Sequence, residues 1–141
     1  MALDVETVRA SFDLAMRGNP AIVPRFYEIL FDRHPQLRAL FGARSVGGGQ
    51  TGMVTEAIVS VVDHLDNAPW LAEELSRLGA RHVAYGVRDE MYEWVGEALL
   101  AALAESVGHG WTPRMDAAWR AALAAVVDLA VEGARRARTA A

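Results

Sequence analysis

Residues 71–87 read LAEELSRLGARHVAYGV, and this stretch decides the fold. Its apolar positions Leu71, Leu75 and Leu78 are followed by His82, at spacings of four, three and four residues. Because an α-helix turns once in about 3.6 residues, these four side chains share one face of a helix. The stretch therefore predicts an amphipathic helix whose buried face includes a histidine. A buried imidazole needs a partner, which is either a hydrogen-bond acceptor or a metal ion.

The rest of the chain repeats the helical pattern. Apolar residues recur at spacings of three and four, and no stretch alternates apolar and polar residues as a half-buried strand does. We expect an all-α fold in one domain over residues 1–141. Helices are expected to end at Gly18, Arg33, Phe41, Leu65, Gly86 and Val107, and a last one to begin at Pro113. Pro24 is expected to cost a hydrogen bond and disturb the first turn of its helix. Residues 42–52, with five glycines, are expected to be mostly irregular.

The composition excludes several classes of protein. The chain of 141 residues is 52% hydrophobic and contains no cysteine, so it has neither a disulfide framework nor a thiolate metal site. A formal net charge of -4 argues against a general affinity for nucleic acid. The sequence contains neither a secretory signal nor an apolar run of the roughly 20 residues that a membrane span needs. We expect a cytoplasmic protein.

The other histidines are poor partners for His82. His34 precedes a proline, and His109 lies between two glycines, so both are expected to be solvated. His64 follows Gln50 by fourteen residues, which is ~20 Å along a helix, too far for both to serve one metal ion. No histidine or carboxylate stands three or four residues after His82, so a bare metal ion would lack ligands. If His82 binds metal, the metal brings its own ligands, which suggests haem.

Four segments carry a family pattern: residues 26–41, 78–87, 92–100 and 111–119. In this order and at these intervals they resemble bacterial single-domain haemoglobins and the haem domain of flavohaemoglobins, over nearly the whole chain. The resemblance implies the globin fold, a three-over-three helical sandwich. It also implies haem b as the cofactor, held between the second, the distal and the proximal helices.

The resemblance implies a role for each of nine residues. His82 matches the proximal histidine that ligates the iron, and Tyr27 and Gln50 match the distal pair that carries the ligand chemistry. Thr51 replaces Gln50 if the alignment gap falls elsewhere. The residues expected to contact haem are Phe41, Val54, Arg81, His82, Val87, Tyr92 and Val95. Tyr27 has a structural alternative, a packed ring with its hydroxyl at the surface.

Other matches have structural alternatives too. Phe41 and Val54 would be apolar in any core, and Tyr92 continues an apolar stripe. Gln50 fits an ordinary loop, and an exposed Arg81 needs no specific partner.

One residue departs from the flavohaemoglobin pattern. A glutamate on the last helix completes the proximal network of that pattern, but counting from Trp119 places Ala134 there. Glu132 lies about 200° around the helix and cannot take its place. The chain also has no room for flavin and nicotinamide domains, so we expect a separate reductase.

The resemblance implies reversible binding of dioxygen, nitric oxide or carbon monoxide by a monomer or homodimer. The alternative is a nitric oxide dioxygenase that works with the separate reductase. A third hypothesis is a helical module without a cofactor, or a sensor domain without its output domain.

Overall fold

The computed structural model describes residues 3–41, 49–84 and 86–140, without the side chains of residues 40–51. The helices are α1 (Val5–Gly18), α2 (Ile22–Arg33), α3 (Arg38–Phe41), α4 (Gly49–Asp63), α5 (Ala68–Ala84), α6 (Asp89–Val107) and α7 (Pro113–Ala140), with 3₁₀ turns at Pro35–Leu37 and Gly108–Gly110. None of the described residues forms a strand, so the predicted all-α class is confirmed.

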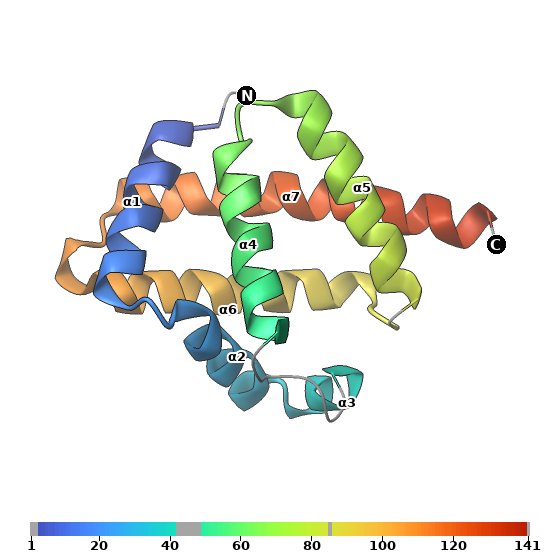
Figure 1. Cartoon of the computed structure of the whole chain (residues 1–141), viewed down its shortest axis with the longest axis horizontal. Helices are drawn as coiled ribbons and strands as arrows, with labels where there is room; N and C mark the ends of the chain where they lie inside the picture. Colours follow the sequence, from blue (N-terminus) through green and yellow to red (C-terminus); the bar gives the residue numbers. More distant parts are fainter. Residues whose placement is uncertain (1–2, 42–48, 85, 141) are drawn as a thin grey trace.

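The helices form two crossing layers (Figure 1). α6 and α7 run side by side and pack on each other, and α2 packs on α6. α1, α4 and α5 cross in front of them. This is the predicted three-over-three sandwich.

The second helix corrects one sequence expectation. α2 begins at Ile22, and its first backbone bond runs from the Arg25 N–H to the carbonyl of Ala21, at 3.2 Å. Pro24 therefore lies in the first turn, where a backbone N–H has no partner within the helix. The expected loss of a hydrogen bond was wrong, because Pro24 falls before the first donor.

The glycine-rich segment is also more helical than expected. α4 already begins at Gly49, so residues 49–52 are helical, whereas residues 42–48 are outside the described part. The end of α5 agrees with the prediction, since the helix ends at Ala84 and Gly86 has a φ of 84°. That left-handed conformation favours glycine.

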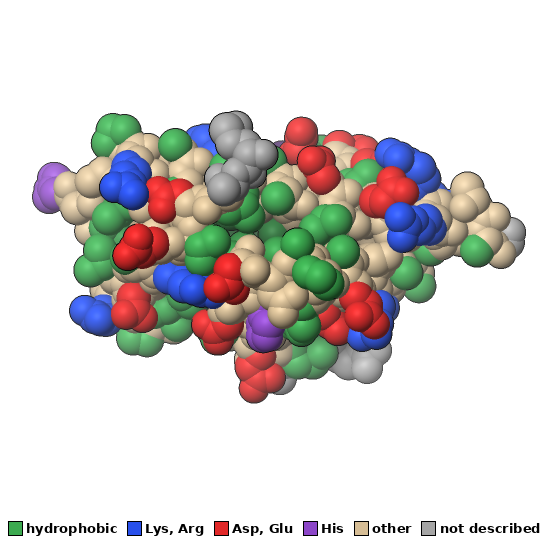
Figure 2. Space-filling view, turned by 90° about the horizontal axis from the view of Figure 1, so that it is seen from above, with side chains coloured by type: hydrophobic (Ala, Val, Ile, Leu, Met, Phe, Trp, Pro, Cys, Tyr) green, Lys and Arg blue, Asp and Glu red, His purple; other side chains and the backbone are tan. Residues whose placement is uncertain are grey.

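The charge distribution on the surface and the hydropathy of the helices agree with the sequence analysis. On the face seen in Figure 2, acidic and basic side chains are interspersed. In the described part of the chain, no helix is long and apolar enough to cross a membrane.

A buried hydrogen bond ties α1 to α7. The Trp119 indole N–H donates to the Ser11 hydroxyl at 2.8 Å, and Ser11 donates in turn to the Thr7 carbonyl at 2.7 Å. Both Trp119 and Ser11 are buried, so the bond satisfies polar groups that water cannot reach.

The crossing of α5 and α7 brings two backbones into contact. A Cβ atom on Gly79 would overlap the Ala130 carbonyl oxygen and lie 2.8 Å from the Ala134 nitrogen. A Cβ atom on Gly133 would lie 2.5 Å from the Ser76 Cα. Each helix thus has a glycine where the other presents backbone. The crossing is closer than any side chain at these two positions allows.

This contact predicts different effects for two glycine-to-alanine substitutions. Gly133→Ala should lower the free energy of unfolding by about 1–3 kcal/mol or more, because α5 and α7 must move apart. Gly96→Ala is the control, since its Cβ would meet only the Leu123 Cδ1, at 4.0 Å. It should stabilise the protein by ~0.5–1 kcal/mol through helix propensity. Urea denaturation measures both, and a Gly133→Ala protein as stable as the wild type would contradict the close crossing.

Candidate functional site

His82 lies in the last turn of α5 with its imidazole in a defined orientation. Its Nδ1 is 2.7 Å from the Leu78 carbonyl oxygen, one turn earlier. Because a carbonyl only accepts, the proton resides on Nδ1 and the lone pair on Nε2. Burial lowers the pKa of His82, the Arg81 charge lowers it further, and the Leu78 bond acts in the opposite direction. With the Nδ1 proton bonded in this way, the neutral ring has its lone pair on Nε2, which is the nitrogen that this tautomer offers to a metal.

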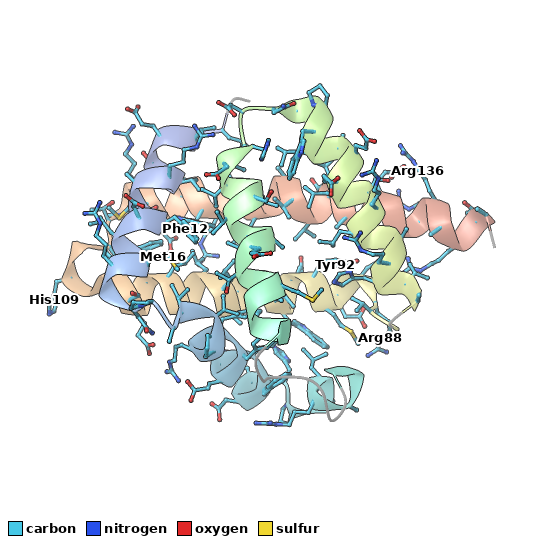
Figure 3. All side chains as sticks on the ribbon, in the orientation of Figure 1. Phe12, Met16, Arg88, Tyr92, His109 and Arg136 are labelled. Carbon is cyan, nitrogen blue, oxygen red and sulfur yellow. The ribbon has the colours of Figure 1, made fainter. Side chains whose placement is uncertain are left out.

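Tyr92 is the neighbour of His82 from α6. The two ring centroids are 6.1 Å apart, and in Figure 3 Tyr92 projects from α6 toward α5. Tyr92 is buried, and its hydroxyl has no hydrogen-bond partner among the described residues. Burial and the nearby Asp89 raise the pKa of Tyr92, and Arg138 opposes them. An unpartnered buried hydroxyl is rare in proteins, so the Tyr92 hydroxyl beside His82 is a candidate functional group.

Where the flavohaemoglobin pattern has a glutamate on the last helix, this chain has Ala134, which lies in the crossing of α5 and α7. Ala134 is 1% exposed and lies against Gly79 in the contact between α5 and α7. Glu132 instead forms surface ion pairs with Arg135 at 3.0 Å and Arg136 at 3.4 Å. Neither residue offers the Tyr92 hydroxyl an acceptor.

Tyr27 is buried within an aromatic cluster on α2. It is 2% exposed, with ring centroids 5.0 Å from Phe26 and 5.7 Å from Phe31. The ring is packed, but at 2% exposure the residue does not present its hydroxyl at the surface as the structural alternative expected. Sequence reasoning missed Phe31, which stacks on Tyr27 at an interplanar angle of 20° and carries the Arg38 guanidinium 4.9 Å above its ring. Its spacing of four residues from Tyr27 was the available signal.

α4 carries the expected distal residues. Val54 is partly buried against the core, while Met53 is 67% exposed. Gln50 belongs to α4 and stands one turn before Val54, but its side chain and those of Phe41 and Thr51 are outside the described ones.

Three further predicted haem contacts, Val87, Val95 and Arg81, differ in their exposure. Val87 is partly buried, and its N–H donates to the His82 carbonyl at 3.0 Å. Val95 is 37% exposed, which is high for a large apolar residue. Arg81 is exposed and makes no ion pair with a described residue.

The structure thus brings His82 and Tyr92 directly together, while Tyr27, Val54 and Val95 lie on α2, α4 and α6. α2 packs against both α4 and α6. Among the described residues, no group of three histidines, aspartates or glutamates can hold a metal ion. The described part of the site therefore offers His82 as the candidate ligand, with the Tyr92 ring beside it.

The chain belongs to the globin family, because the family model described as Globin matches residues 24–129. Curated relatives include a flavohemoprotein from Bordetella pertussis, which is 32% identical over 125 residues, or 88% of this chain. Another from Vibrio cholerae serotype O1 is 29% identical over 119 residues, or 84% of this chain. The matches cover 31% and 30% of those proteins. The chain thus spans less than a third of the length of these relatives.

Solved structures share the fold. A bacterial globin from Campylobacter jejuni has a TM-score of 0.80 and 19% identity, with 94% of each chain covered. A flavohemoglobin from Malassezia yamatoensis, with bound FAD and heme, has a TM-score of 0.74 and 24% identity. That match covers 94% of this chain and 36% of the other. At these identities the likeness demonstrates the globin fold.

Proposed function

We propose that this chain binds haem b through His82 and reversibly binds dioxygen or another diatomic gas. The observation that carries the proposal is the orientation of the His82 imidazole, whose Nδ1 lies 2.7 Å from the Leu78 carbonyl oxygen. This leaves the Nε2 lone pair as the iron ligand. Haem would supply the ferrous iron to which the gas binds.

The other residues present fit haem as well. The apolar side chains of Met53 and Val95 reach the surface and are available to an apolar macrocycle. Arg81 has no ion pair with a described residue and is available to a propionate. The Tyr92 hydroxyl provides a buried polar group on the histidine side. The flavohemoprotein relatives and the heme of the Malassezia protein support the same assignment.

On the distal side, Tyr27 would donate a hydrogen bond to the gas ligand. Its burial between Phe26 and Phe31 keeps water away and strengthens any hydrogen bond made there. Gln50 would be a second donor, and Val54, one turn along α4, would limit the space above the ligand.

The second candidate function is nitric oxide dioxygenation, in which bound oxygen reacts with nitric oxide. The burial of Tyr27 favours this candidate, because a buried hydrogen-bond donor would hold the oxygen firmly. This reaction needs an electron donor, for which we propose a separate reductase. With Ala134 in place of the carboxylate, we expect slow turnover in a steady-state assay of nitric oxide consumption. Residues 1–141 would act as one cytoplasmic domain, as a monomer or homodimer.

Haem titration of two histidine variants tests the main proposal. His82→Ala should lose haem or bind it at least tenfold more weakly, because the axial bond is gone. His64→Ala is the control and should bind haem as the wild type does. Its imidazole is engaged elsewhere, 2.7 Å from the Ser60 carbonyl and stacked on Trp70. The Soret band measures binding. Stoichiometric haem with an unchanged ferrous spectrum in His82→Ala would refute the assignment.

Oxygen dissociation tests the role of Tyr27. Tyr27→Phe keeps the ring and removes one hydrogen bond to a partly charged acceptor, a loss of about 1.5–3 kcal/mol. Stopped-flow measurement should give roughly tenfold to hundredfold faster oxygen dissociation, with a much smaller effect on carbon monoxide. If Gln50 shares the ligand, the effects of Tyr27→Phe and Gln50→Leu should not add. Equal oxygen dissociation rates in wild type and Tyr27→Phe would reduce the hydroxyl to a packing role.

A further inference from the structure

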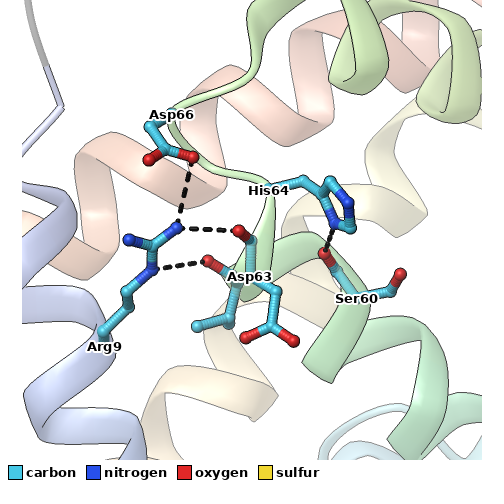
Figure 4. Close-up of polar contacts among 6 residues, drawn as sticks. Arg9, Ser60, Asp63, His64 and Asp66 are labelled. Atoms are coloured by element: carbon cyan, nitrogen blue, oxygen red, sulfur yellow. Dashed lines mark hydrogen bonds and ion pairs between the residues drawn. The ribbon is translucent and has the colours of Figure 1, made fainter.

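An arginine of α1 bonds to the carboxyl end of α4 (Figure 4). The Arg9 Nε donates to the Val62 carbonyl at 3.2 Å, and its Nη2 donates to the Asp63 carbonyl at 2.7 Å. The same Nη2 lies 3.2 Å from an Asp66 carboxylate oxygen. The last carbonyls of a helix lack partners within it, and a cation there is favoured by the helix dipole. Arg9 therefore acts as a C-terminal cap supplied by another helix.

The other backbone carbonyls at the carboxyl end of α4 accept hydrogen bonds from residues close to them in the sequence. The His64 N–H donates to the Ser60 and Val61 carbonyls at 3.1 Å each, and the His64 Nδ1 donates to Ser60 at 2.7 Å. For the Asp63 carbonyl, Arg9 supplies the only donor among the described residues. The His64 ring also stacks on Trp70 of α5, with centroids 3.9 Å apart. The end of α4 is thus held by both α1 and α5.

Burial decreases from this end of α4 toward the other. On the face of α4 that carries Val62, Ile58 and Val54, Val62 is 5% exposed, whereas Ile58 and Val54, one and two turns earlier, are only partly buried. α4 packs against α1 and α2. The helix is therefore fixed most firmly at its carboxyl end, and the residues expected above the ligand lie toward the less buried end.

We propose that Arg9 is a positioning residue that sets the direction of α4 and thereby the height of Val54 above the bound gas. This rests on the proposed haem function. Val54 is nine residues from Asp63, or ~13 Å along the helix. A tilt of about 10° at the anchored end moves it by roughly 2 Å, because the displacement scales with that length. Arg9 thus controls a distal residue that it does not touch.

Hydrogen exchange on the purified full-length chain, with and without haem, tests the anchor. Arg9→Met keeps the aliphatic stem and removes both bonds to carbonyls. Arg17→Met is the matched control on the same helix, since among the described residues Arg17 pairs only with Asp13, one turn away, at 3.0 Å. In Arg9→Met, amides of α4 should exchange roughly tenfold faster or more, while those of α6 and α7 keep the rates of the control.

Carbon monoxide rebinding after flash photolysis tests the effect at the ligand site. This gas responds little to hydrogen bonding, so its rate reports the space that Val54 leaves. Arg9→Met should change the association rate by roughly two- to thirtyfold relative to Arg17→Met. If hydrogen exchange of the α4 amides is unchanged in Arg9→Met, or is raised equally in every helix, Arg9 does not anchor α4. Faster α4 exchange with an unchanged carbon monoxide rate overturns the positioning role. Absence of haem binding instead refutes the proposed function, and exchange without haem still tests the anchor.

Discussion

The backbone contact between α5 and α7 is the constraint on which the rest of the site depends. Gly79 and Gly133 allow the two helices to approach until only backbone separates them. This fixes the position of α5, and with it the direction in which its last turn presents His82. Ala134 is buried in the same contact, where a Cβ atom on Gly79 would lie 2.8 Å from its backbone nitrogen. One packing contact therefore positions the helix that carries the candidate ligand, and it includes the alanine that stands where the flavohaemoglobin pattern has a glutamate.

The two sides of the site are held in different ways. The side of His82 is rigid, because its helix rests on another helix over glycine contacts and the imidazole is bonded to its own backbone. The opposite side depends on α4, whose carboxyl end is bonded by Arg9 and whose core-facing residues are less buried at Val54 than at Val62. A fixed ligand helix and an adjustable covering helix suit a protein that must hold a cofactor tightly and still admit a small gas.

Sequence periodicity was enough to predict the helices and the face of His82, because burial of an amphipathic helix follows directly from residue spacing. Leu71 and Leu75 are buried as the pattern requires. Periodicity could not reveal the role of Gly79. A glycine within a helix indicates a close helix crossing only when its small partner residue on the other helix, here Gly133, is known. The error at Pro24 came from placing the helix start too early.

The candidate site was predicted less completely than the fold. Tyr92 and Tyr27 were identified by family resemblance, and only the structure distinguishes a fully buried tyrosine from one whose hydroxyl reaches the surface. Arg9 was invisible to sequence reasoning, because its acceptors are backbone carbonyls on a distant segment and carry no residue-type signal. The roles of Phe41 and Gln50 remain predictions, since their side chains are outside the described part.

Resonance Raman spectroscopy of the ferrous, gas-free protein loaded with haem tests the central claim most directly, because it detects the bond between iron and imidazole. The account predicts an iron–histidine stretching band that shifts when a heavier iron isotope is used and is absent from His82→Ala. A wild-type protein without an isotope-sensitive band, or a His82→Ala protein that retains it, would contradict the assignment of His82 as the iron ligand.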